Sequence, residues 1–197
     1  MRWICALLVV SAVASCSRVS GPVYYQIPLV MEQQAGRERQ QSGEHTPAIW
    51  VDQVALPDYL AGNGIVYQTS DVKYVIASSN LWASPLEQQL KLAMVTSLSS
   101  RLADRMISDR PLGLHPDTLN VNVTGFHGRY DGRAVVTGDW VLQCGDEIFQ
   151  QDFRLILPQH SDGYNGLVET LGQGWQQVSD QIARQAVYVT QSRKKTV

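Results

Sequence analysis

The sequence predicts an α+β fold in which a single, mostly antiparallel β-sheet carries two amphipathic helices packed on one face. Three observations lead to this prediction. The segment from Leu119 to Leu157 alternates apolar and polar residues between turn signals, as strands with one buried face do. Apolar residues at helical spacing occur once before and once after this segment. The 197 residues contain no internal repeat and have the length of one domain.

Four short β-prone runs precede the first helix, and prolines or turn residues separate them. Pro28 places the first run at a sheet edge or ends it, because proline cannot donate to a strand ladder. Gly62–Gly64 predicts a hairpin turn. The four runs are residues 23–29, 49–56, 65–68 and 72–77.

The first helix has a clear start signal. Ser84 is the expected N-cap, Pro85 the first helical residue, and Glu87 completes a capping box that satisfies backbone N–H groups. An apolar residue then recurs every fourth position, which predicts one buried stripe. The stripe consists of Leu86, Leu90, Met94, Leu98, Leu102 and Met106.

Three strands and a second helix follow. Asp131–Gly132 and Gly145–Asp146 are turn signals that divide the alternating segment into a meander. The second helix begins after Ser161–Gly163, and Gly172 and Gly174 within it allow close packing on the sheet. The basic segment 191–197 is expected to be a frayed tail. The apolar positions of this helix are Leu167 or Val168, Leu171, Trp175, Val178, Ile182 and Ala186.

The first 15 residues have the pattern of a bacterial lipoprotein signal peptide. Arg2 precedes an apolar stretch that is too short to span a membrane. Val13, Ala14, Ser15 and Cys16 then match a lipobox, in which the cysteine thiol accepts a diacylglycerol. The alternative is a buried N-terminal helix. We therefore expect a signal peptide over 1–15, a lipidated tether over 16–22 and a domain over 23–190.

The remaining polar residues give no catalytic or metal site. The histidines are scattered, no C-x-x-C pair or nucleophile motif is present, and the polar segment 31–47 predicts a solvated loop. Cys5 leaves with the signal peptide and Cys144 lies on an apolar strand face, so a disulfide within one chain is excluded. The net charge of -2 argues against a nucleic-acid-binding protein. No cofactor is indicated. A catalytic carboxylate pair among the strand acids remains the alternative.

Several aromatic residues are candidates for a partner-binding surface. Tyrosine and tryptophan are enriched at protein–protein interfaces, although the same residues also fill cores. The candidates are Tyr24, Tyr25, Tyr59, Tyr67 and Trp82.

Four stretches in order cover nearly the whole mature chain. They are Tyr24–Pro28, Val54–Leu60 with Ile65–Tyr67, Leu81–Glu87, and Phe153–Pro158 followed by Asp162–Tyr164 and a helix ending Ile182–Ala183. Together with the lipobox, this set resembles the paraquat-inducible PqiC family, also called the ABC-type transport auxiliary lipoproteins.

The resemblance implies a non-enzymatic outer-membrane lipoprotein whose domain faces the periplasm. Ser17 after the acylated cysteine also favours release to the outer membrane. Such proteins dock a periplasm-spanning, PqiB-like MCE protein as a ring-shaped homo-oligomer while lipid moves between membranes. Two other classes remain open at this stage: a lipoprotein activator of a cell-wall synthesis enzyme, and a hydrolase of envelope lipids.

Overall fold

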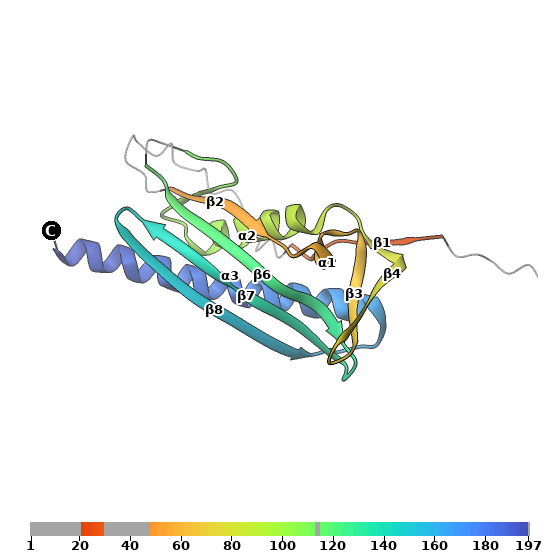
Figure 1. Cartoon of the computed structure of the whole chain (residues 1–197). Helices are drawn as coiled ribbons and strands as arrows, with labels where there is room; N and C mark the ends of the chain where they lie inside the picture. The colour runs from red at the N-terminus through yellow and green to blue at the C-terminus, as the bar shows by residue number, and fades with distance from the viewer. Residues whose placement is uncertain (1–20, 30–47, 113–114, 197) are drawn as a thin grey trace, which may run out of the picture.

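A computed structural model describes residues 21–29, 48–112 and 115–196, with side chains described through Ser192. The expected signal peptide 1–15, the lipobox with Cys16, and the polar loop 31–47 lie outside the described residues. Within the described residues, eight strands and three helices form an α+β fold (Figure 1), which confirms the predicted fold class.

The strands are β1 (Val23–Tyr25), β2 (Ala48–Ala55), β3 (Gly64–Ser70), β4 (Lys73–Trp82), β5 (Met106–Ser108), β6 (Asp117–Arg129), β7 (Arg133–Cys144) and β8 (Glu147–Pro158). The helices are α1 (Asp58–Ala61), α2 (Leu86–Arg101) and α3 (Gly163–Thr196).

The sheet branches at β6. One edge of β6 pairs with β7 along its whole length, whereas the other edge pairs first with β2 and then, at Gly128 and Arg129, with β3. The long ladders β3–β4, β6–β7 and β7–β8 are antiparallel, as predicted. The pairings β1–β4, β2–β5, β2–β6 and β3–β6 are parallel, which the sequence does not reveal.

The predicted hairpin turn at Gly62–Gly64 is wrong. This segment connects α1 to β3, and the two flanking strands β2 and β3 lie one after the other along the same edge of β6. The short helix α1 was not predicted. It carries the chain past the middle of β6, so that β3 resumes pairing further along the same strand.

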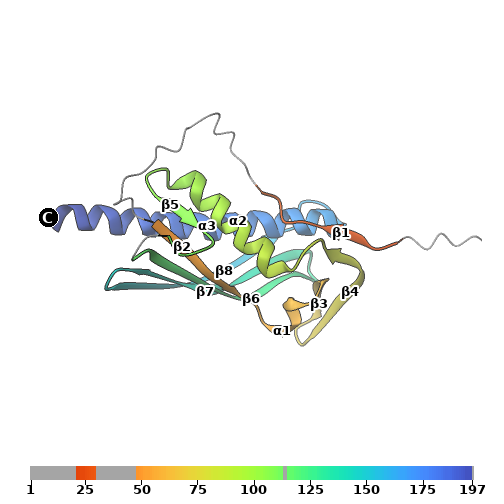
Figure 2. The ribbon, with the colours of Figure 1, turned by 90° about the horizontal axis from the view of Figure 1, so that it is seen from above.

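Helices α2 and α3 cover one face of the sheet, as predicted, while α1 and the β3–β4 hairpin lie on the opposite side (Figure 2). Alternate residues of the β6–β8 meander point toward the layer formed by α2 and α3. They include Trp140 at 1 % exposure and Cys144 at 0 %. Cys144 is therefore a core residue, as its position on an apolar strand face predicts.

The domain is elongated because α3 is long. Its 34 residues correspond to a rod of about 50 Å. At one end, which we call the N-terminal end, lie Gly21, β1 and the β3–β4 hairpin. At the other, the C-terminal end, α3 runs past the β7–β8 turn and ends beyond it (Figures 1 and 2). None of the described helices combines the length and apolar character that a membrane span requires.

Two features of the first predicted helix are wrong. Helix α2 begins at Leu86 with Pro85 at the N-cap position, and no side chain makes the expected capping bond. The Ser84 carbonyl instead accepts a hydrogen bond from Gln89 Nε2 at 2.8 Å. Met106 belongs to β5 and not to the helical stripe, because the helix ends at Arg101 and the chain turns to pair with β2.

The second predicted helix is longer than expected. The basic segment that the sequence suggests is a frayed tail continues α3 through Thr196. A Cβ on Gly174 would lie 2.8 Å from Val136, so this glycine does allow close packing on the sheet. A Cβ on Gly172 would instead lie 2.8 Å from Pro28, so this glycine accommodates the N-terminal segment.

That N-terminal segment, Gln26–Leu29, forms a strap across α2 and α3. The Ile27 N–H donates to Gln89 Oε1 at 2.9 Å, and Ile27 is 2 % exposed. The Ala83 N–H donates to the Tyr25 carbonyl at 2.8 Å. Gln89 therefore binds both the strap and the start of its own helix, which fixes where the chain enters the domain.

A buried ion pair holds the C-terminal half of α3 against the sheet. Arg105 donates to Asp117 Oδ2 at 2.8 Å, and their side chains are 3 % and 10 % exposed. Arg105 also donates to the hydroxyl of Thr190 on α3. The guanidinium thus joins the segment before β5, the first residue of β6, and the last third of α3.

We expect Arg105→Met to lower the free energy of unfolding by about 3–5 kcal/mol, because it leaves the Asp117 carboxylate buried without its countercharge. Arg101→Met is the matched control, since it breaks the more exposed pair with Asp180 and should cost at most about 1 kcal/mol. Denaturant unfolding of the two variants measures the difference. Similar losses in both would contradict the role assigned to Arg105.

Candidate docking surface

The structure brings three of the five aromatic candidates together. In the parallel β1–β4 pairing, Tyr24 lies opposite Leu81 and Tyr25 lies opposite Trp82. Tyr59, on α1, and Tyr67, on β3, lie elsewhere around the same end of the domain. Their placement on a partner-binding surface stays a prediction, but their burial and hydrogen bonds show which of them are accessible.

Four of the five side chains serve the fold. The Tyr25 hydroxyl donates to Asn80 Oδ1 at 3.2 Å. The Tyr59 hydroxyl donates to the Thr124 carbonyl at 2.7 Å. The Tyr67 hydroxyl donates to the Arg129 carbonyl at 2.8 Å. Trp82 is only 3 % exposed. Tyr24 alone among the five is largely exposed, at 62 %.

Sequence reasoning missed a group of exposed apolar residues on the β3–β4 hairpin. We call this group, Val72, Tyr74, Val75 and Ile76, the hairpin surface. Val72 is 92 % exposed at the tip, and the other three are between 43 % and 53 % exposed. The sequence signal is a run of apolar residues after the turn, interrupted only by Lys73, with no regular polar alternation. It is ambiguous because such a run equally suits a buried strand.

A stacked aromatic cluster holds this hairpin against the sheet. The ring centroids of Tyr59 and Tyr74 are 5.1 Å apart, and Tyr74 meets His127 edge-on at 5.1 Å. Burial, with the neighbouring Tyr74, raises the pKa of Tyr59 to about 12. His127 is 3 % exposed, and its Nδ1 lies 3.0 Å from the Gly128 carbonyl. The cluster sits on the face of the sheet opposite α3 and joins α1, β4 and β6.

Burial is the main cause that lowers the pKa of His127, and the charge of Arg129 adds to it, while the hydrogen bond to Gly128 opposes it. The neutral imidazole is therefore the form that the folded cluster accepts.

A second exposed group lies at the opposite end of the domain. We call Arg184, Val187 and Tyr188 the α3-end surface; Val187 is 41 % and Tyr188 62 % exposed. No acidic residue follows Asp180, whereas four basic residues do: Arg184, Arg193, Lys194 and Lys195. The end of α3 is thus apolar and positively charged.

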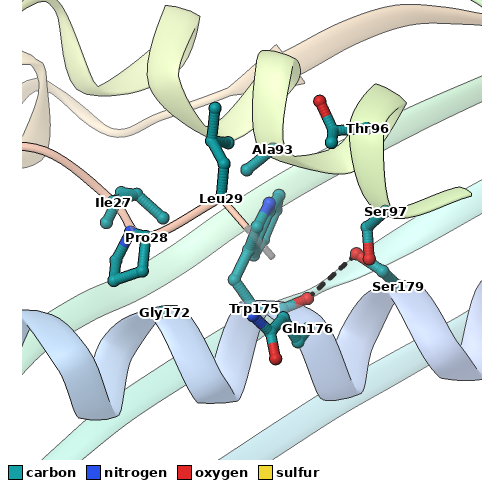
Figure 3. Close-up of a pocket in the computed structure, with 10 residues that line it drawn as sticks. All are labelled: Ile27, Pro28, Leu29, Ala93, Thr96, Ser97, Gly172, Trp175, Gln176 and Ser179. Carbon is teal, nitrogen blue, oxygen red and sulfur yellow. Dashed lines mark hydrogen bonds between the residues drawn. The ribbon is translucent and has the colours of Figure 1, made fainter. Parts of the chain in front are cut away.

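Two hollows in the described chain are both smaller than a substrate site. One lies beneath the strap, where Pro28 sits over Gly172 and Trp175 lies between α2 and α3 (Figure 3). Its volume of about 10 Å³ accommodates no more than a single water. The other, beside Gln88 and Leu92, is about 140 Å³, well below the range of ligand pockets. Across residues 21–29, 48–112 and 115–196, no three His, Cys, Asp or Glu side chains form a metal-binding group.

Comparison with known proteins identifies the family. The model for the ABC-type transport auxiliary lipoprotein component matches residues 25–183. The chain belongs to this family. The Escherichia coli (strain K12) intermembrane transport lipoprotein PqiC is 48 % identical over 175 residues, covering 87 % of this chain and 90 % of that protein. PqiC of Shigella flexneri matches to the same extent.

Solved structures share the fold. The crystal structure of an uncharacterized protein, 50 % identical, superposes with a TM-score of 0.75 over 85 % of this chain and 99 % of that one. A Xanthomonas campestris protein that is only 12 % identical shares the fold, with a TM-score of 0.61 over 89 % and 98 % of the two chains. Members of the auxiliary lipoprotein family are transport lipoproteins and not enzymes, in agreement with the non-enzymatic role expected from the sequence. The chain is thus a lipid-anchored protein of the cell envelope.

Stability should depend on pH through His127. Its pKa is lowered in the folded state, so the unfolded chain binds a proton first as the pH falls below about 6.5. We expect the stabilisation to be full above that pH and to be lost as the pH falls through the folded pKa. His127→Gln should flatten this decline in the free energy of unfolding, measured by denaturant titration from about pH 8 to about pH 5. Equal slopes for the two proteins would contradict the assignment.

Proposed function

We propose that this protein is the outer-membrane subunit of an MCE-type intermembrane lipid transport system, anchored through acylated Cys16 and docking the periplasm-spanning MCE protein. Family membership and the intermembrane transport role named for the PqiC relatives support a transport function. The observation that carries the docking role is the separation of two exposed surfaces by the length of α3, with the chain entering the domain at only one of them.

The lipid anchor limits the distance and orientation of the domain relative to the membrane. The seven residue steps between Cys16 and Val23 span at most roughly 25 Å. The N-terminal end therefore stays near the membrane that holds the acyl chains. The C-terminal end, about 50 Å away along α3, is free to extend into the periplasm toward the partner.

The α3-end surface has the composition of a docking site. Tyr188 and Arg184 are residue types that are enriched at protein interfaces, and Val187 adds apolar area beside them. The absence of acidic residues after Asp180 favours a partner with a negatively charged docking segment. We assign this end of α3 to the MCE protein.

A ring of identical subunits requires two unlike surfaces that fit head to tail. Across the C-terminal half of the sheet, the strand order is β5-β2-β6-β7-β8, so β5 and β8 form its two lateral edges. Each pairs with one strand only among the described residues. We propose that the ring closes by contact between the β8 side of one subunit and the β5 side of the next.

Native mass spectrometry of the detergent-extracted protein tests the anchor and the ring. We expect the mature chain to begin at Cys16, to carry the mass of a lipidated cysteine, and to form one closed oligomer. Cys16→Ala should remove the acyl mass and release the protein from the membrane fraction. A mature chain that begins elsewhere would refute the anchor, and a monomer in mild detergent would refute the ring.

Docking is tested by co-purification with the MCE protein from solubilised envelopes. Tyr188→Asp places a charge in the α3-end surface and should reduce recovery of the MCE protein about tenfold or more, as the loss of an interface hot spot does. Leu92→Asp is the matched control, because Leu92 is an apolar residue of α2 with 51 % exposure and lies outside this surface. Recovery of cell-wall synthases instead of an MCE protein would favour the activator function.

A further inference from the structure

We propose that the hairpin surface, continued by Val23 and Tyr24 on β1, rests in the headgroup region of the lipid bilayer that holds the N-terminal anchor. The proposal rests on the anchor at Cys16 and adds a second membrane contact, made by the folded domain itself. Four observations support it: the apolar tip, the exposed apolar residues on the paired strands β4 and β1, the charges beside the tip, and the length of the tether.

The tip of the β3–β4 hairpin has an unusual residue. Tight turns between strands favour Gly, Asn, Asp and Ser, because polar side chains and small residues suit an exposed turn. Here Val72 occupies the tip and is 92 % exposed, the highest exposure among the large apolar residues described as exposed. An aliphatic side chain at this position makes no favourable interaction with water, and its burial in lipid is favourable.

The exposed apolar residues of β4 and β1 form two groups, which we call the strip, with the exposed polar residues Ser78 and Ser79 between them. Strand β4 runs from the hairpin tip to Trp82, with Val75 and Ile76 exposed in its first half. Its last three residues pair with β1, which adds Val23 and Tyr24 to the strip. The whole strip lies at the N-terminal end of the domain in both views (Figures 1 and 2).

The turn between β6 and β7 reinforces the tip. The Tyr130 hydroxyl donates to Asp71 Oδ1 at 2.8 Å, which fixes the two turns side by side. Tyr130 is 52 % exposed, and tyrosine is enriched at the boundary between lipid and water. Lys73 follows Val72 directly, and Arg129 and Arg133 flank Asp131 on the adjoining turn. Three basic against two acidic side chains give this tip a small positive charge that suits anionic headgroups.

The tether brings this end to the membrane. The chain upstream of Val23 reaches Cys16 within at most roughly 25 Å. The domain cannot leave the bilayer surface by more than this distance, so the strip stays within reach of the lipid headgroups. The effective concentration of lipid around it is therefore high, and even weak burial of a few side chains suffices for contact.

The backbone of β4 limits the depth of insertion. Before Asn80, the outer edge of β4 has no neighbouring strand in the described chain, so its N–H and C=O groups need water. Such groups are not tolerated in the hydrocarbon core of a bilayer. The side chains of the strip therefore enter the headgroup and upper acyl region, while the strand edge stays at the level of the headgroups.

Site-specific fluorescence on the complete acylated protein tests the contact. Val72→Cys, Val23→Cys and Ile148→Cys are each labelled with an environment-sensitive fluorophore. Ile148 is the matched control, because it is apolar, 67 % exposed and located on the β7–β8 hairpin at the other end of the domain. Buried Cys144, at 0 % exposure, does not compete for the label. The proteins are reconstituted into vesicles of phosphatidylethanolamine and phosphatidylglycerol, with or without bromine on the acyl chains.

We expect labels at positions 72 and 23 to shift to shorter wavelength and to lose emission in brominated vesicles, whereas the label at 148 does neither. A label at 72 that is as exposed to water and as little quenched as that at 148 would overturn the proposal. Shielding from water without bromine quenching would overturn it in favour of a second copy of the chain. Equal quenching at all three positions would also overturn it, because the domain would then lie flat.

Flotation of the same vesicles separates this result from the anchor. Protein that fails to float with the vesicles refutes acylation at Cys16 and therefore the proposed function. Protein that floats but shows no quenching at position 72 refutes only the lipid contact of the hairpin. Circular dichroism melting of each labelled variant verifies that the substitution leaves the fold intact.

Discussion

Burial of Trp175 is the interaction on which the rest of the structure depends. Its indole meets Phe126 of β6 and Phe153 of β8 edge-on, and its Nε1 donates to the Leu90 carbonyl of α2 at 3.0 Å. It also lines the hollow beneath the strap (Figure 3). One side chain therefore joins the sheet, both long helices and the N-terminal segment. Because α3 is seated at this point, its two ends are fixed relative to the sheet, and the surfaces that we assign to lipid and to protein stay apart.

The extent to which the fold follows from the sequence differs between regions. The meander was predicted well, because Val121 and Trp140 alternate with polar neighbours and short turns set the register. The parallel pairings were not predictable, since they join segments that are far apart along the chain and depend on the shared edge of β6. Met106 fits the helical spacing but pairs in β5, and only the completed sheet shows why. Long-range pairing overrides local periodicity at such positions.

The candidate surface followed less well from the sequence. The aromatic candidates Tyr25, Tyr59, Tyr67 and Trp82 are largely used to hold the domain together, and their role in partner binding stays a prediction. The hydroxyl groups of the three tyrosines reach backbone or side-chain acceptors more than 50 residues away, and no local pattern reveals such partners. The exposure of Val72 follows from the projection of the hairpin beyond the body, which is a property of the assembled fold. Apolar residues with unusual exposure were thus more informative than aromatic content alone.

The strap gives the domain a defined mechanical attachment. If the membrane and a bound partner move relative to one another, tension along the polypeptide enters through β1 and Gln26–Leu29 before it reaches the core. There it meets the Ile27–Gln89 hydrogen bond and the close seat of Pro28 over Gly172. The contact with Gln89 transmits the tension to α2, and the contact with Gly172 transmits it to α3. The force is therefore shared by two helices and does not act on a single edge strand alone. In the docking role that we propose, such an attachment would keep the domain folded while the transport assembly moves.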